Sequence, residues 1–120
     1  MTIAVILQSK GSEVLTVECD TKVRDVVGLL ADRKIGAVPV VRAGRVAGIM
    51  SERDVIYRLR SDGAEILDWT VEQIMTAPAI TVEPSTEILS ALSLMTRRRI
   101  RHLPVVEGEA LIGLVSIGDL

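Results

Sequence analysis

The stretch KIGAVPVVRAGRVAGIMSERD, residues 34–54, decides the fold because it occurs again as RIRHLPVVEGEALIGLVSIGD at residues 99–119. The offset of 65 residues (residue 99 against residue 34) holds without a gap from about Thr16 to Val55. Roughly a third of the aligned positions are identical, and most others exchange one aliphatic residue for another. Upstream, Thr2, Ile3, Ile6 and Leu7 mirror Thr70, Val71, Ile74 and Met75, with three extra residues in the first copy before Thr16. A duplication explains this pattern.

Each copy predicts a short strand followed by a helix. The strands are expected at Val14–Val17 and Ala79–Val82, and helix-start residues follow at Asp20–Thr21 and Ser85–Thr86. Apolar residues then recur at i, i+3, i+4 and i+7, which is the spacing of one helix face. These residues are Val23, Val26, Val27 and Leu30 in the first copy, and Ile88, Ala91, Leu92 and Met95 in the second.

A hairpin and a second helix complete each copy. The predicted strand pairs are Val38–Val41 with Val46–Met50, and Leu103–Val106 with Leu111–Val115, joined at Ala43–Gly44 and Gly108–Glu109. The second helix is expected to begin at Ser51 and at Ser116. The fold class is therefore α+β (α/β-like), with two β-α-β-β-α repeats packed about a pseudo-twofold axis. We assign residues 1–63 to repeat 1, 64–69 to a linker around Trp69, and 70–120 to repeat 2, whose final helix is truncated at Leu120.

Composition excludes several classes of protein. Hydrophobic residues make up 48% of the chain and aromatic residues 2%, so the core must be aliphatic and base-stacking platforms are missing. The net charge of −2 gives no field that would attract DNA or anionic lipid. The single cysteine, Cys19, cannot form an internal disulfide; we interpret it as a semi-buried small residue, with a modestly reactive thiol as the alternative. The apolar run Ile3–Leu7 is too short for a signal or a membrane span, so we expect a cytoplasmic protein without a membrane partner.

The strings AVPVV…VAGIMSERD and HLPVV…LIGLVSIGD resemble the CBS domain, and nearly the whole chain resembles a tandem CBS pair (a Bateman module) of the stand-alone bacterial type. Both copies match the family's strand–Gly–x–x–Ser/Thr–x–x–Asp signature. The resemblance implies a regulatory module that binds an adenosine-containing effector in the clefts between the repeats: AMP, ADP, ATP, NAD or S-adenosylmethionine. It also implies a homodimer and a regulated partner protein of unknown identity.

The same resemblance implies the site residues. The ribose would be bound by Ser51 and Asp54 in one cleft, and by Ser116 and Asp119 in the other. Phosphate would be bound by Arg101, with His102 and Arg99 as further candidates. The base slot would be lined by Leu15, Thr16, Ile35 and Pro39 in the first copy, and by Ile80, Thr81, Ile100 and Pro104 in the second. Gly36 and Ala37 stand where the second copy has Arg101 and His102, so the two clefts are expected to differ.

Each of these residues also has a purely structural interpretation. Ser–x–x–Asp is a capping-box pattern, although Asp is short for reaching back to the cap residue. In favour of ligand binding, the helix N-terminus after each serine would offer unpaired N–H groups to an anion. The run Arg97–Arg101 fits a solvated helix end, with Arg97 and Arg98 expected at the surface. His102 has no second histidine or spaced carboxylates with which to form a metal site.

No nucleophile–base pair, metal set or Gly-rich phosphate loop appears, so we expect no enzyme. The alternatives to the regulatory module are a ligand-free structural dimerisation module and a weak nucleic-acid binder that uses the Arg97–Arg101 run. The second copy stops one residue after Asp119, whereas the first continues through Val55–Leu59, so we expect either a trimmed parent or an early end.

Overall fold

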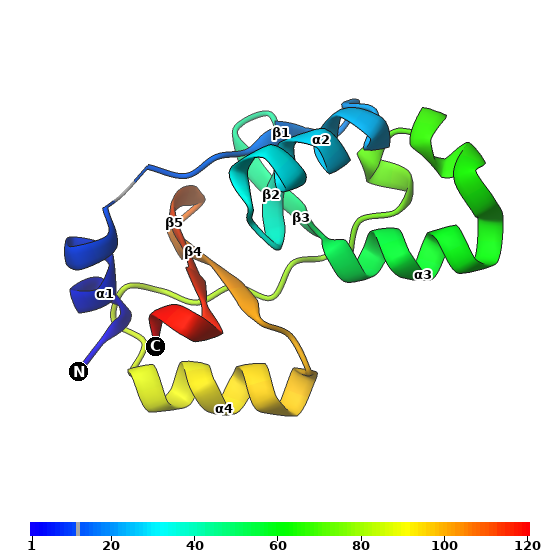
Figure 1. Cartoon of the computed structure of the whole chain (residues 1–120). Helices are drawn as coiled ribbons and strands as arrows, with labels where there is room; N and C mark the ends of the chain where they lie inside the picture. The colour runs from blue at the N-terminus through cyan, green and yellow to red at the C-terminus, as the bar shows by residue number, and fades with distance from the viewer. Residues whose placement is uncertain (12) are drawn as a thin grey trace. The chain divides into compact units, whose positions relative to one another are not determined.

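The computed structural model describes residues 1–11 and 13–120. The chain divides into two compact units. We call residues Leu15–Ala79 the central unit, and we call Met1–Val14 together with Ile80–Leu120 the terminal unit. Both units combine helices with β-strands, so the fold is α+β, as the repeat predicts (Figure 1).

The central unit contains a three-stranded sheet of order β1-β2-β3. Strand β1 (Val17–Glu18) runs parallel to β2 (Ala37–Arg42), which pairs antiparallel with β3 (Arg45–Ser51). The β2–β3 turn has positive φ at both Ala43 (52°) and Gly44 (78°), the geometry of a two-residue hairpin turn. Helix α2 (Val23–Arg33) connects β1 to β2, and helix α3 (Glu52–Asp62) follows β3. Two 3-10 helices, Gly63–Asp68 and Val71–Gln73, end the unit's helical part.

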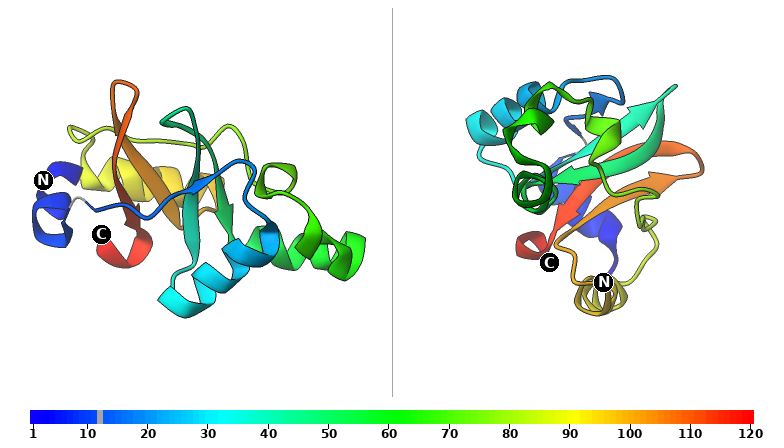
Figure 2. Two further views of the ribbon diagram at one scale, coloured as in Figure 1. Left: turned by 90° about the horizontal axis from the view of Figure 1, so that it is seen from above. Right: turned by 90° about the vertical axis from the view of Figure 1, so that its right-hand side faces the viewer.

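The terminal unit repeats this arrangement with fewer strand residues. Helix α4 (Ile88–Arg98) precedes the hairpin of β4 (His102–Glu107) and β5 (Ala110–Ser116), and a 3-10 turn (Ile117–Asp119) follows it. Helix α1 (Ile3–Lys10), from the start of the chain, packs on β5. Both hairpins are long twisted ribbons (Figure 2), and their registers shift at equivalent places, Val40/Val41 and Val105/Val106.

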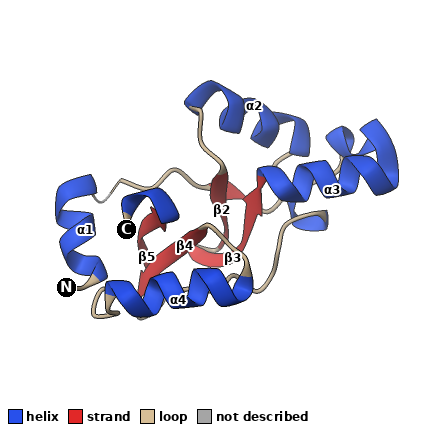
Figure 3. Ribbon diagram, turned by 60° about the horizontal axis from the view of Figure 1, so that its bottom comes forward, coloured by secondary structure: helices blue, strands red, loops and turns tan. Residues whose placement is uncertain are grey.

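Aliphatic side chains fill both cores, and the predicted helix faces are confirmed. Val23, Val26 and Leu30 of α2 are buried in the central unit. Ile88, Ala91 and Met95 of α4 are buried against the β4–β5 hairpin, along which α4 lies (Figure 3). Val27 and Leu92, the i+4 members of the two series, lie at the edges of these cores. Each fully buried aliphatic side chain contributes about 1.5–3 kcal/mol to folding.

Each unit is completed by the segment that introduces the other copy of the repeat. In the terminal unit, Ile3 N donates to Thr86 O at 2.9 Å. In the central unit, the equivalent bond joins Val71 N to Thr21 O at 2.7 Å. The segments of the upstream match, residues 2–7 and 70–75, therefore occupy equivalent places in the two units. Each segment packs with the copy of the repeat that it does not introduce, and we call the two the exchanged segments. The repeat boundaries at residues 63 and 70 divide the sequence, whereas the compact units divide the chain near residues 15 and 80.

The exchange explains where the sequence misplaced the first helices. Helices α2 and α4 begin at Val23 and Ile88, after the expected start residues, and no side chain caps them. The first N–H group of each helix instead donates to a backbone carbonyl that precedes the other copy of the repeat. Val23 N donates to Trp69 O (2.8 Å), and Ile88 N donates to Met1 O (3.0 Å). Thr86 Oγ1 accepts from Glu83 N at 3.1 Å and so stabilises the preceding turn rather than the helix.

Two further expectations need correction. The strand predicted at Val14–Val17 is β1, which begins only at Val17. The strand predicted at Ala79–Val82 is reduced to one isolated parallel bridge between Val82 and Val105. In the segment 64–69, Ile66 is fully buried in the central core and Trp69 packs against that core. The Arg58 guanidinium carbon lies 5.4 Å from the centroid of the Trp69 ring.

Two equivalent glycines permit the exchanged segments to pass close to the hairpins. A Cβ on Gly48 would lie 2.7 Å from the backbone oxygen of Thr76 and 2.8 Å from Met75 Sδ. A Cβ on Gly113 would lie 2.5 Å from Leu7 Cδ2. Leu7 and Met75 are partners in the upstream match, so the same crossing occurs in both units. At Gly48 the obstacle includes backbone, whereas at Gly113 it is the end of a flexible side chain.

We therefore expect Gly48→Ala to destabilise the protein by about 1–3 kcal/mol, as overpacking typically does, and Gly113→Ala to cost less. Gly28 in α2 is the matched control because its added Cβ meets nothing within 4 Å. Gly28→Ala should stabilise by about 0.5–1 kcal/mol through helix propensity. Urea unfolding of the three variants measures this order. An equal effect of all three would contradict the close-crossing account.

Candidate functional site

The Ser–x–x–Asp sequence forms the same turn at the end of both hairpins. Ser51 and Ser116 are extended residues at the ends of β3 and β5. Ser51 N donates to Asp54 Oδ2 at 2.8 Å, and Asp54 N donates back to Ser51 Oγ at 3.3 Å. In the terminal unit, Ser116 N donates to Asp119 Oδ2 at 2.7 Å. The expectation that Asp is too short to reach the cap residue is therefore wrong, and both carboxylates are oriented by the backbone.

The first N–H group after each serine already has a partner. Glu52 N donates to Gly36 O at 3.0 Å, and Ile117 N donates to Arg101 O at 2.8 Å. The sequence predicts an anion site made of unpaired helix N–H groups. In each unit, one of these N–H groups is already hydrogen-bonded and is not available to an anion. In the terminal unit, the 3-10 turn Ile117–Asp119 follows Ser116. The same bonds hold the backbones of Gly36 and Arg101 against the two turns.

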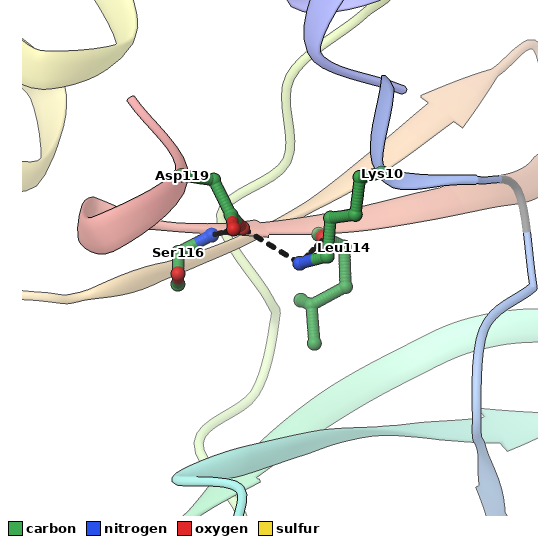
Figure 4. Close-up of polar contacts among 4 residues, drawn as sticks. All are labelled: Lys10, Leu114, Ser116 and Asp119. Carbon is green, nitrogen blue, oxygen red and sulfur yellow. Dashed lines mark hydrogen bonds and ion pairs between the residues drawn. The ribbon is translucent and has the colours of Figure 1, made fainter. Parts of the chain in front are cut away.

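The exchanged segments supply one more donor to each aspartate. In the central unit, Thr76 Oγ1 donates to Asp54 Oδ1 at 3.0 Å. In the terminal unit, Lys10 Nζ donates to Asp119 Oδ2 at 2.6 Å and to Leu114 O at 2.7 Å (Figure 4). Asp54 is therefore held by neutral donors and Asp119 by a cation. Sequence reasoning missed Thr76 and Lys10, although both follow the upstream match that marks the exchanged segments.

In the central unit, Thr76 uses two donors for two acceptors. In the terminal unit, the ammonium group of Lys10 alone donates to both equivalent acceptors. Thr76 N donates to Ile49 O at 2.9 Å, while its hydroxyl donates to Asp54. Leu114 is the repeat partner of Ile49, and its carbonyl accepts from Lys10 Nζ instead. The two units thus satisfy equivalent acceptors, but only the terminal unit does so with a positive charge.

The charge of Lys10 affects the titration of Asp119. Burial alone would raise the pKa of Asp119, but the hydrogen bond from Lys10 and the N–H of Ser116 oppose it. The positive charge of Lys10 and the Ser116 hydroxyl act in the same direction. Together they hold the pKa of Asp119 below its ordinary value, so the carboxylate is ionised at neutral pH.

The three phosphate candidates lie in different surroundings. His102 is half-buried at the start of β4, directly opposite Ser116 in the hairpin register. Arg101 is exposed, and only its backbone is joined to the turn by a hydrogen bond. Arg99 is the exposed left-handed cap of α4, with φ of 54°, so it belongs to the helix end. In the central unit, Ala37 occupies the equivalent place opposite Ser51. The two hairpins therefore share a register, but the residue opposite the serine differs, as the sequence predicts.

The base-slot candidates divide into strand residues and partly exposed neighbours. Pro39 and Pro104 are buried within β2 and β4. Leu15 and Ile35 are 36% and 37% exposed, and Thr81 is also exposed. Thr16, Ile80 and Ile100 are partly buried. The parallel pairing of Val17 with Val40 brings Thr16 close to Pro39, and the bridge Val82–Val105 does the same for Thr81 and Pro104.

Other groups add no further chemistry to these turns. Cys19 is 7% exposed in the central core, and burial is the main cause that raises the pKa of its thiol. Within residues 1–11 and 13–120, no group of three or more His, Cys, Asp or Glu side chains is arranged to hold a metal ion. Among the described residues, no helix combines the length and apolar character needed to cross a bilayer.

Comparison with known proteins identifies what the chain is similar to. The family model of the CBS domain matches it twice, over residues 10–61 and 71–120. The mitochondrial CBS domain-containing protein CBSX3 of Arabidopsis thaliana is 38% identical over 99% of this chain, which spans 62% of that protein's length. The crystal structure of a CBS-domain containing protein from Agrobacterium tumefaciens is 36% identical, with a TM-score of 0.94 over 98% of this chain and 89% of that one.

A more distant structure shares the fold. The CBS domain pair of the protein MJ0100, solved with 5′-methylthioadenosine and S-adenosyl-L-methionine, is 22% identical to this chain. Its TM-score is 0.87, over 99% of this chain and 91% of that one.

The ion pair at Asp119 leads to a prediction about pH. A carboxylate whose folded pKa is lowered stabilises the fold above its unfolded pKa of about 3.9, and that stability is lost as pH falls through the folded pKa. Lys10→Met should therefore destabilise the protein at pH 7 by about 0.2–1 kcal/mol, as partly exposed ion pairs do. The difference from the unchanged protein should shrink as pH falls through the lowered folded pKa of Asp119.

Urea unfolding at several pH values measures this difference. Lys22→Met is the control, because Lys22 Nζ donates to the backbone oxygen of Asp68 (2.9 Å) and to no carboxylate. Its effect should not follow the titration of Asp119. A Lys10→Met effect that did not change with pH would show that the loss comes from packing rather than from the ion pair.

Proposed function

Because the chain belongs to the CBS domain family, we propose that it is a regulatory module that binds an adenosine-containing ligand at its two Ser–x–x–Asp turns and signals occupancy to a partner or a second copy. The observation that carries the proposal is the pair of equivalent turns in which a backbone N–H orients each carboxylate. A carboxylate held in this way can accept hydrogen bonds from two ribose hydroxyls. Such charge-assisted bonds contribute about 1.5–3 kcal/mol each.

The MJ0100 complex supports an adenosyl ligand, since that protein is a CBS domain pair bound to two adenosyl compounds. In the proposed complex, Ser51 and Asp54 bind one ribose, and Ser116 and Asp119 bind the other. His102, opposite Ser116, and Arg101, next to the turn through its backbone, are the proposed phosphate ligands. Arg99 is the weakest of the three because it caps a helix. The base would pack along Leu15, Thr16, Ile35 and Pro39, or along Ile80, Thr81, Ile100 and Pro104.

The proposal assigns no catalytic role to this chain. The two family matches cover residues 10–61 and 71–120, and the proposal gives both a regulatory role. The nucleic-acid alternative rests on the run Arg97–Arg101. Its first two members, Arg97 and Arg98, lie exposed in the last turn of α4, where cations are favoured without any ligand. The cytoplasmic location stays a prediction.

A thermal-shift titration with AMP, ATP, NAD and S-adenosylmethionine tests ligand binding. A ligand at ~100 times its Kd should raise the free energy of unfolding by ~2.7 kcal/mol. In the double variant Asp54→Asn, Asp119→Asn the shift should be lost, because the amides cannot supply two charged acceptors to a ribose. If none of the four compounds raises the melting temperature at millimolar concentration, the ligand-free dimerisation module replaces this proposal.

We propose that a second copy of the chain packs on α3. No residue along the described length of α3 is buried, and Ile56, Tyr57 and Leu59 are 60%, 67% and 41% exposed. An apolar helix surface of this kind is typical of an interface. Light scattering after gel filtration should give twice 13.0 kDa for the unchanged chain.

The double variant Ile56→Glu, Tyr57→Glu should be monomeric, because it would bury charge in the interface. Leu89→Glu is the control, since Leu89 is 80% exposed on α4 and lies outside the proposed surface. A monomeric unchanged chain, or a variant that remains dimeric, would overturn the assignment of α3.

A further inference from the structure

The terminal-unit turn differs from its counterpart by one positive charge, and that charge is held in place. Lys10 Nζ donates to Asp119 Oδ2 at 2.6 Å and to Leu114 O at 2.7 Å, so two acceptors position the ammonium group. Its side chain is 40% exposed, and that of Asp119 is 26% exposed. Figure 4 shows Lys10 reaching the carboxylate from the end of α1, while Ser116 N approaches the same carboxylate from the hairpin. Lys10 is therefore joined to the turn by two hydrogen bonds.

The ammonium group has a donor to spare. Lysine carries three N–H donors, and two of them are used by Asp119 and Leu114. Within the described part of the chain, the third N–H of Lys10 has no acceptor. A half-exposed ammonium with one open donor can bind an additional anionic oxygen without giving up its existing partners.

The charge balance of the turn follows from this ion pair. Among the described residues, Asp54 accepts from Ser51 N, Ser51 Oγ and Thr76 Oγ1, and none of these neutral donors offsets the charge of a carboxylate. At Asp119 the charge of Lys10 cancels that of the carboxylate. A ribose-bound nucleotide holds its 5′-phosphate one sugar ring away, well inside the screening length of about 8 Å at physiological salt. An uncompensated carboxylate repels that phosphate, whereas a carboxylate paired with lysine does not.

We infer that Lys10 is a specificity-determining residue that makes the terminal-unit turn select an adenosine ligand with a 5′-phosphate over the uncharged nucleoside or a cationic sulfonium compound. The inference rests on the proposed adenosyl binding and adds the chemical class of ligand. The central-unit turn, with Thr76 in the place of Lys10, lacks this selection. Arg101 and His102 then act with Lys10, whereas Gly36 and Ala37 give the central unit no equivalent.

Isothermal titration of the full chain with AMP, adenosine and S-adenosylmethionine tests the inference. The unchanged protein should bind AMP more tightly than the other two. Lys10→Met should reduce the ratio of AMP to adenosine affinity at least about tenfold, the effect of losing one hydrogen bond to a charged group. If two classes of site are resolved, only one should change. Lys10→Arg should keep most of the ratio because it keeps the charge.

Lys22→Met is the matched control, because it changes the net charge equally but lies in the central unit with a backbone carbonyl as its partner. It should leave the ratio unchanged. Lys10→Gln serves as a second neutral variant if Lys10→Met fails to fold. Equal loss of AMP and adenosine binding in Lys10→Met, or an unchanged ratio, would overturn the role of Lys10 while adenosyl binding stands. No binding of any of the three compounds by the unchanged protein would overturn the proposed function and this inference together.

Discussion

The close crossing of the exchanged segments over the two hairpins is the constraint on which the rest of the structure depends. At Gly48 and Gly113 there is no room for a Cβ beside Thr76 and Leu7. Because glycine lets the backbones approach, the segment before one copy of the repeat can complete the core of the other. Ile3 and Val71, the first buried residues of these segments, are both fully buried as a result. Neither copy of the repeat is therefore a complete folding unit by itself.

The crossing also builds the candidate site. A segment that passes over β3 or β5 ends beside the turn that follows that strand. Thr76 and Lys10 reach Asp54 and Asp119 for this reason. The fold thus couples the packing of the exchanged segments to the charge of the carboxylates.

The two units show how duplication permits divergence at the site while the frame stays the same. Hairpin registers, bulges, serine turns and helix-start hydrogen bonds are equivalent in both units. One difference at the turn lies in what the exchanged segment presents: a backbone N–H and a hydroxyl from Thr76, or an ammonium from Lys10. The neutral donors of Thr76 and the ammonium of Lys10 bind equivalent acceptors. Both lie at the partly exposed edge of their unit, so the cores are unaffected by the difference.

The sequence by itself determined the duplication, the hairpins, the α2 and α4 faces and the Ser–x–x–Asp turns, because periodicity and turn chemistry act over a few neighbouring residues. It misjudged the reach of the aspartate and the strand at Ala79–Val82, whose outcomes depend on packing. Only the tertiary structure decided that Lys10 meets Asp119, 109 residues away, and that Thr76 meets Asp54. The physical reason is that a segment shows the same apolar pattern whether it packs on its own copy of the repeat or on the other copy. The local sequence therefore does not reveal the exchange.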